Sequence, residues 1–318
     1  MNSSKNVMKN LSKIVMAGLL LFSVTSCNDD DETPDPVPAT TITDVMANNP
    51  NFSILKTAVV KAGLSETLAG SGTFTVFAPD NDAFAAAGIS SADIDKLSSD
   101  ALKDILLYHT LESKVEAANV PAGPNAPVKT IGGKSIYLTN KSAGVYVNGV
   151  AVKQGNVMAS NGVIHVISNV LMPPVANLVE AAQANENLSF LVAAAVRASQ
   201  GSTNIVQALS ATDSLTVFAP TNQAFKDAGF PDVASIQAAD PNTLAATSGK
   251  PVIGSKAFSS DLVNDANLPT LNGGTVKIGL GETATIKGAS NANPAKITAV
   301  NIVTTNGVVH VIDQVLLP

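Results

Sequence analysis

Apolar residues recur along the chain with two periods, and each period predicts a type of element. A stripe spaced by three and four residues predicts a helix that opens the second half of the chain. A run alternating by twos over residues 73–77 predicts a strand. The helical stripe comprises Leu188, Leu191, Val192, Ala195 and Val196, and its counterpart in the first half comprises Phe52, Leu55, Val59 and Ala62.

Turn and cap signals divide these elements. Pro79 ends the strand, and Asp80 is placed to cap a short helix, as Thr221 is in the second half. Asn161-Gly162 is a strong hairpin signal. The segment after it is apolar at successive positions, which predicts a central strand buried on both faces.

Several segments occur twice in the same order. Residues 77–84 return at 218–225 with a shift of 141, and residues 161–167 return at 306–312 with a shift of 145. Gly132-Gly133, which we interpret as a turn before a strand, returns as Gly273-Gly274. This order indicates a duplicated unit with a boundary near Pro173-Pro174.

The repeated motifs resemble the two hallmark segments of the fasciclin domain. The resemblance covers residues 41–173 and 174–318. It implies an α+β fold: two tandem fasciclin-like domains, each a wedge-shaped β-sheet core with packed α-helices. It also implies adhesion without catalysis. The family-motif residues, expected to be mainly structural, are Phe77, Pro79, Asn81, Phe84, Asn161, Gly162 and His165 in the first copy and Phe218, Pro220, Asn222, Phe225, Asn306, Gly307 and His310 in the second.

The first copy also matches the Tyr-His segment of that family, at Tyr108 and His109. In the second copy this pair falls on Lys250-Pro251, so the segment is lost there. If the segment contributes to binding, as proposed for animal relatives, the first domain is the binding domain. His109 itself continues an apolar helical stripe, which favours a structural histidine.

Residues 1–26 have the pattern of a lipoprotein signal peptide. Three lysines precede an apolar run, 14–22, that is too short to span a bilayer. Residues 24–27 then resemble the bacterial lipobox, which makes Cys27 the lipid attachment site. The alternative is a plain secretory signal, but Cys27 is the only cysteine and can form no internal disulfide.

An acidic, proline-rich linker comes next, over residues 27–40. Residues 28–32 resemble the export tag of Bacteroidetes surface lipoproteins, and they are also what a solvated, extended linker would contain. The segment predicts a protein anchored by lipid in the outer membrane, exposed at the cell surface, and in contact with the membrane only through its anchor.

Charge argues against nucleic acid as a partner. The whole chain has a net charge of −6, and loss of the three leader lysines leaves 16 basic residues against 25 acidic ones, a net −9. Phosphate binding needs clustered lysine and arginine.

No arrangement of residues predicts an enzyme, a cofactor or a metal site. There are three histidines, and the two at matched positions, His165 and His310, fall on predicted buried strands, which favours a structural role. No nucleophile–base motif or metal-ligand spacing is present. Around Ser214, residues 213–215 resemble a Bacteroidetes O-glycosylation acceptor, and the alternative is an exposed turn.

The sequence therefore predicts a non-enzymatic cell-surface lipoprotein that mediates adhesion to proteins, glycans or extracellular matrix. The alternative is an accessory glycan-binding protein of an outer-membrane nutrient-capture system.

Overall fold

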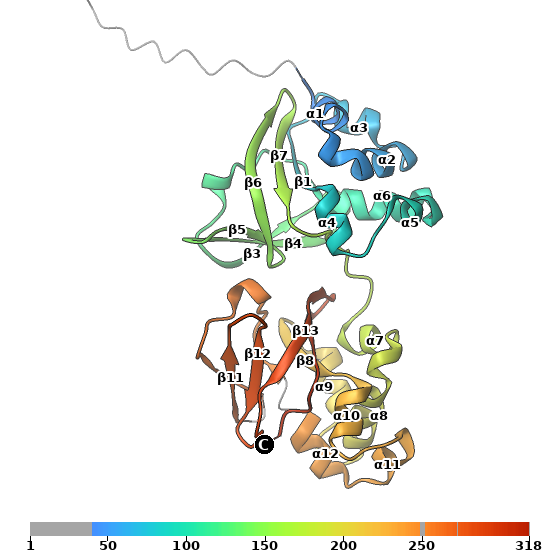
Figure 1. Cartoon of the computed structure of the whole chain (residues 1–318), viewed down its shortest axis with the longest axis vertical. Helices are drawn as coiled ribbons and strands as arrows, with labels where there is room; N and C mark the ends of the chain where they lie inside the picture. The colour runs from blue at the N-terminus through green and yellow to red at the C-terminus, as the bar shows by residue number, and fades with distance from the viewer. Residues whose placement is uncertain (1–39, 249–251, 272, 318) are drawn as a thin grey trace, which may run out of the picture. The chain divides into compact units, whose positions relative to one another are not determined.

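A computed structural model of the chain describes residues 40–248, 252–271 and 273–317 (Figure 1). The predicted signal peptide, Cys27, the linker up to residue 39 and Lys250-Pro251 lie outside the described residues. The elements form two successive sets with a similar order of helices and strands, which we call the first and second domains. The duplication seen in the sequence is thus a duplication of structure.

The first domain is one seven-stranded sheet with helices, in the strand order β2-β1-β7-β6-β5-β4-β3. Only β1 and β7 run parallel to each other. The helices are α1 (Ile42–Asn48), α2 (Ser53–Lys61), α3 (Ser65–Ala69), α4 (Asn81–Ala86), α5 (Ser91–Lys96) and α6 (Ser99–Tyr108). The strands are β1 (Phe74–Pro79), β2 (Thr110–Leu111), β3 (Gly123–Lys129), β4 (Ser135–Lys141), β5 (Gly144–Val147), β6 (Val150–Ala159) and β7 (Gly162–Ile167).

The second domain repeats this topology, in the strand order β10-β11-β12-β13-β14-β8-β9, with β8 and β14 parallel. Its helices are α7 (Leu178–Gln183), α8 (Ser189–Ala198), α9 (Ile205–Ala211), α10 (Asn222–Asp227), α11 (Val233–Ala238) and α12 (Pro241–Ser248). Its strands are β8 (Leu215–Pro220), β9 (Val252–Ile253), β10 (Asn267–Pro269), β11 (Thr275–Gly279), β12 (Thr285–Gly288), β13 (Ala295–Val303) and β14 (Gly307–Ile312).

Each sheet bends along one long strand. In the first domain β6 has two register shifts against β7, and Asn156 on it has φ 57°. Such bulges kink a strand and increase its twist. The bend creates two cores in the first domain. In one core, helices α1–α6 pack against the adjacent strands β1 and β7. In the other, the two halves of the sheet enclose Phe77, Tyr108, Leu138, Val147 and Ile167.

The predicted central strand is confirmed. All six residues of β7 are buried, and β7 lies between β1 and β6. The hairpin is also present, but its turn is Ser160-Asn161, because Ala159 already pairs with Gly162. Gly162 is needed there because a Cβ at this position would collide with the carbonyl oxygen of Phe74 on the neighbouring strand.

The predicted caps are confirmed in both domains. The Asp80 carboxylate accepts from the backbone N–H of Ala83 at 2.8 Å, and the Thr221 hydroxyl accepts from that of Ala224 at 3.2 Å. Pro79 does end its strand, although β1 includes it as the last residue.

The two predicted helical stripes differ in their burial. Every member of the first stripe is buried. In the second, Leu188 and Leu191 are buried, whereas Val192 and Ala195 are half-buried and Val196 is 49% exposed. The predicted helix is present as α8, but its buried face does not coincide with the stripe and comprises Phe190, Leu191, Ala194 and Ala198.

Candidate binding loop and the motif residues that hold it

Tyr108, the last residue of α6, lies inside the first domain. It is 1% exposed, and its hydroxyl donates to the carbonyl oxygen of Ser135 at 3.2 Å. The hydroxyl oxygen accepts from the side-chain amide of Asn148 at 2.9 Å. Burial raises the pKa of Tyr108 to about 12, so the phenol is neutral at physiological pH.

His109 is 2% exposed and uses both ring nitrogens. Nδ1 donates to the carbonyl oxygen of Ile105 at 2.8 Å, and Nε2 accepts from the backbone N–H of Leu171 at 2.9 Å. Burial lowers the pKa of His109 to about 4, which keeps the ring neutral. Tyr108 and His109 therefore have no surface to offer a partner, and any contribution to binding would come from the segments they position.

The edge strand β2 comes after His109, and it leads into a largely exposed loop, residues 112–119, which we call the first loop. Glu112, Ser113 and Lys114 are exposed at its start. Thr75 on β1 fixes this stretch, because its hydroxyl donates to the carbonyl oxygen of Ser113 at 2.6 Å and accepts from the N–H of Val115 at 2.8 Å.

Two further side chains hold the first loop from β6 and β7. His165 Nε2 donates to the carbonyl oxygen of Val115 at 2.8 Å, and the ring stacks on Phe77 with centroids 5.5 Å apart. Asn156 accepts from the N–H of Ala117 at 2.9 Å. Burial lowers the pKa of His165, which favours the neutral ring.

The second domain repeats this arrangement at residues 254–261. Thr216 donates to the carbonyl oxygen of Ser255 at 2.6 Å, His310 Nε2 donates to that of Ala257 at 2.9 Å, and Asn301 accepts from the N–H of Ser259 at 2.7 Å. His310 stacks on Phe218 at 5.1 Å, and burial lowers its pKa. These contacts agree with the structural role expected of the two matched histidines.

The motif asparagines connect segments that are distant in sequence. Asn161 accepts from the N–H of Ile42, which begins α1, at 2.9 Å. Its amide donates to the carbonyl oxygens of Leu68 and Gly70 at the end of α3, at 2.8 and 2.9 Å. Asn306 makes the matching contacts with Leu178, Leu209 and Thr212.

Asn81 and Asn222 join the start of α2 and α8 to the strand–helix corner. Asn81 accepts from the N–H of Ile54 at 3.2 Å and donates to the carbonyl oxygen of Pro50 at 3.0 Å. Asn222 makes the equivalent contacts with Phe190 and Glu186. The remaining motif side chains fill the cores: Phe77, Phe84, Phe218 and Phe225 are all buried.

Sequence reasoning missed Thr75, Asn148 and Asn156. Asn148 is 2% exposed, has φ 49° and supports the Tyr108 hydroxyl. The dipeptide Asn148-Gly149 was the available signal, since it marks a turn, but it does not reveal a buried partner 40 residues away. Ser214 is exposed with φ 61° directly before β8, a position that agrees with a turn and leaves its hydroxyl accessible.

The described part of the chain contains neither a membrane-spanning helix nor a metal-binding cluster. No helix there is long and apolar enough to cross a bilayer. No group of three or more His, Cys, Asp or Glu side chains within the same residues could hold a metal ion.

The fasciclin domain model matches the chain twice, at residues 50–173 and 186–318. Protein sll1483 of Synechocystis is 44% identical over 138 residues, which is 43% of this chain and 75% of that protein. Human periostin is 30% identical over 268 residues, 80% of this chain and 29% of periostin. The match therefore spans less than a third of periostin.

Two further comparisons are with a cell surface glycolipoprotein and with a cell adhesion molecule. The cell surface glycolipoprotein MPB83 of Mycobacterium bovis is 32% identical over 135 residues, 40% of this chain and 58% of that protein. A solved FAS1 domain pair from the insect cell adhesion molecule Fasciclin I has a TM-score of 0.42 at 18% identity, covering 86% of this chain and 94% of the pair.

Proposed function

This chain belongs to the fasciclin domain family, and we propose from that membership that it is a non-enzymatic adhesion protein. Its partner is an extracellular protein, glycan or matrix component, and nucleic acid is not a partner. The buried histidines support this proposal, because the hydrogen bonds of their ring nitrogens to backbone groups leave them unsuited to acid–base chemistry.

The first loop has an exposed, polar edge, yet it is held by the buried side chains of Thr75 and His165 and by the exposed side chain of Asn156. Thr75, Asn156 and His165 together make four hydrogen bonds to its backbone. A loop ordered before binding loses less conformational entropy when a partner arrives. Glu112 and Lys114 at its exposed edge offer one acceptor and one donor of opposite charge.

The corresponding loop of the second domain, residues 254–261, differs at its start. Gly254, Ser255 and Lys256 stand where the first domain has Glu112, Ser113 and Lys114, so one carboxylate is missing. The Tyr-His pair is also absent from the second copy. Both differences favour the first domain as the binding domain.

We also propose that Cys27 carries the lipid that anchors the protein in the outer membrane, with the domains at the cell surface. The leader and lipobox pattern supports this. So does the similarity to a protein named as a cell surface glycolipoprotein. Residues 28–38 would then space the domains from the headgroups.

A binding screen tests the adhesion proposal. The mature chain without its anchor cysteine, residues 28–318, is applied to a glycan array and to a panel of matrix proteins. Saturable binding to matrix proteins supports adhesion. Binding to glycans alone would favour the nutrient-capture alternative, and turnover of a hydrolytic substrate panel would contradict the non-enzymatic assignment.

A further inference from the structure

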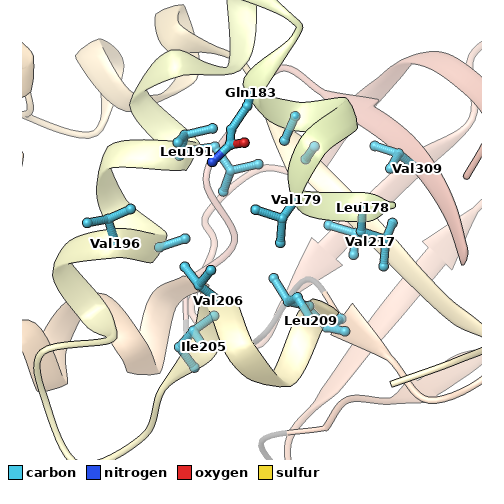
Figure 2. Close-up of a pocket in the computed structure, with 15 residues that line it drawn as sticks. Leu178, Val179, Gln183, Leu191, Val196, Ile205, Val206, Leu209, Val217 and Val309 are labelled. Atoms are coloured by element: carbon cyan, nitrogen blue, oxygen red, sulfur yellow. The ribbon is translucent and has the colours of Figure 1, made fainter. Parts of the chain in front are cut away.

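The second domain contains an apolar groove whose cavity volume is about 50 Å³. Helices α7, α8 and α9 surround it, and Val217 of β8 and Val309 of β14 form part of its lining (Figure 2). Of the 15 lining residues, Gln183 is the one polar residue, and none is charged. Gln183 extends from α7 toward the groove, as Figure 2 shows.

The first domain supplies an internal comparison, because the helix caps align the two copies. Thr41 caps α1 as Asn177 caps α7. Counting from these caps, Met46 stands in the first domain where Ala182 stands in the second. Met46 is 2% exposed and part of the core. A core methionine of the first domain therefore corresponds to an alanine that lines the groove in the second.

The position of Ala195 on α8 gives the same result. Its counterpart on α2 is Val59, which is 3% exposed in the core of the first domain. Two core side chains of the first domain are thus replaced by alanine in the second, and both alanines line the groove. Unfilled space of this kind destabilises a domain unless something occupies it.

The residues at the rim of the groove also differ between the two domains. They are polar in the first domain and apolar in the second. The first domain has Thr43, Lys56 and Ser65 at the rim positions. There, the Thr43 hydroxyl donates to the carbonyl oxygen of Ser65 at 3.1 Å and ties α1 to α3. The corresponding residues of the second domain are Val179, Val192 and Val206, all of which line the groove and are partly exposed.

A hollow interior and an apolar rim are each unfavourable in water, and one apolar ligand would offset both. We propose that this groove binds the alkyl chain of a free single-chain amphiphile, with the end of the chain in the cavity and the head group in solvent. This assigns to the second domain a ligand of a different class from the adhesion partner of the first.

Size and polarity both select an unbranched chain. The cavity has about a third of the volume of the ~150 Å³ engineered cavity that accepts benzene, so a ring is too wide for it. A peptide would bring backbone N–H and C=O groups that Gln183 alone cannot satisfy. The absence of charged lining residues means that no ion pair holds the head group, which leaves it outside.

Titration of the chain 28–318 with 1-decanol, followed by methyl NMR of labelled valine and leucine, tests the proposal. We expect saturable shifts of the methyl groups of Val179, Val206 and Leu209. The methyl groups of Val59 and Leu68 in the first domain, which are buried and line no pocket, should not move. No saturable shift at the groove, or equal shifts in both domains, would overturn the proposal.

Variants that fill the cavity, compared with a control variant at an exposed position, also test the proposal. Ala182→Met introduces the residue that the first domain has, and we expect it to weaken decanol binding at least roughly tenfold. Ala208→Met adds the same side chain to an exposed position of α9 and should leave binding unchanged. Ala195→Val is the second cavity-filling variant and serves if Ala182→Met does not fold, as judged by its melting transition.

Retention of full affinity in the folded cavity-filling variant would contradict the proposal. A final experiment distinguishes binding of a free amphiphile from binding to a bilayer. The same chain is mixed with phosphatidylcholine vesicles, and we expect no cosedimentation. Cosedimentation without any response to decanol would overturn the assignment of a free amphiphile.

Discussion

Asn161 makes three hydrogen bonds that fasten α1 and α3 to the hairpin, and its side chain is buried. Replacing it by alanine leaves the N–H of Ile42 and two carbonyl oxygens without these partners. Each unpaired buried group costs about 1–3 kcal/mol. We expect Asn161→Ala to lower the free energy of unfolding of the first domain by about 3 kcal/mol.

Urea unfolding followed by tyrosine fluorescence measures this effect selectively, because all three tyrosines, Tyr108, Tyr137 and Tyr146, belong to the first domain. Asn51→Ala, at an exposed asparagine, is the control and should change little. A loss below about 1 kcal/mol for Asn161→Ala would show that water or rearrangement replaces the bonds.

His109 predicts how the stability of the first domain depends on pH. Its pKa falls from 6.5 to about 4 on folding, so the folded state favours the neutral ring. This contribution is complete above pH 6.5 and is lost as pH falls from 6.5 toward 4. It amounts to about 3 kcal/mol.

The measurement is urea unfolding by tyrosine fluorescence at several pH values from neutral down to the folded-state pKa of His109. His109→Gln cannot titrate and should show a shallower decline over this range, from a lower stability at neutral pH. An equally steep decline in the variant would assign the pH dependence to other groups, such as His165, whose pKa burial also lowers.

At the residue scale, the sequence predicts local contacts correctly and leaves distant partners hidden. Asp80 and Thr221 cap helices as predicted, because a cap contacts residues three positions away. The Asn-Gly signal predicts a turn at Asn161, yet the side chain of this residue bonds to Ile42, 119 positions away. Sequence alone cannot pair such groups.

At the scale of elements, variants at the corner between β1 and α4 should differ in stability in a predictable order. Asp80 caps α4 and also forms an ion pair with Lys153, with 2.7 Å between Oδ2 and Nζ. We expect Asp80→Ala to destabilise the first domain by about 1 kcal/mol through loss of the cap. Asp80→Thr, which copies Thr221, should recover most of this loss, since a partly exposed ion pair adds little.

Thermal unfolding of the three proteins, followed by tyrosine fluorescence, ranks them. The expected order of stability is wild type, then Asp80→Thr, then Asp80→Ala. Equal losses for the two variants would mean that the ion pair with Lys153 outweighs the cap.

The apolar stripe of α8 shows that the spacing of apolar residues predicts a helix but not the burial of each residue in it. Spacing by three and four residues correctly predicts one face of the helix, but not how well its neighbours cover it. Val192, Ala195 and Val196 line a groove together with Ala182 of α7, which stands where the first domain has Met46. That difference becomes visible only when the two copies are aligned in space.

For the whole molecule, the α+β fold and its duplication were predictable from two repeated motifs. The motifs place the parallel pair of strands, β1 with β7 and β8 with β14, inside each sheet. The bend of each sheet was not predictable, because bulges such as the one at Asn156 leave no clear sequence pattern.

The proposed anchor makes a prediction for the complete protein in a bacterial host. Cys27→Ser removes the thiol that would take up lipid, so the protein should move from the membrane fraction to the soluble fraction. Mass spectrometry of the wild-type N-terminus should show a lipidated Cys27. An unmodified cysteine, or a mature chain that starts elsewhere, would contradict the anchor.

Adhesion through the first loop is tested most directly by the affinity of the mature chain for the matrix protein that the screen identifies. We compare wild type with the double variant Glu112→Ala and Lys114→Ala, whose side chains are exposed at the loop edge. The control is Lys103→Ala with Asp104→Ala, an exposed pair of opposite charges on α6. The proposed function predicts at least a roughly tenfold loss of affinity for the loop variant alone. Unchanged affinity in that variant, or an equal loss in the control, would contradict it.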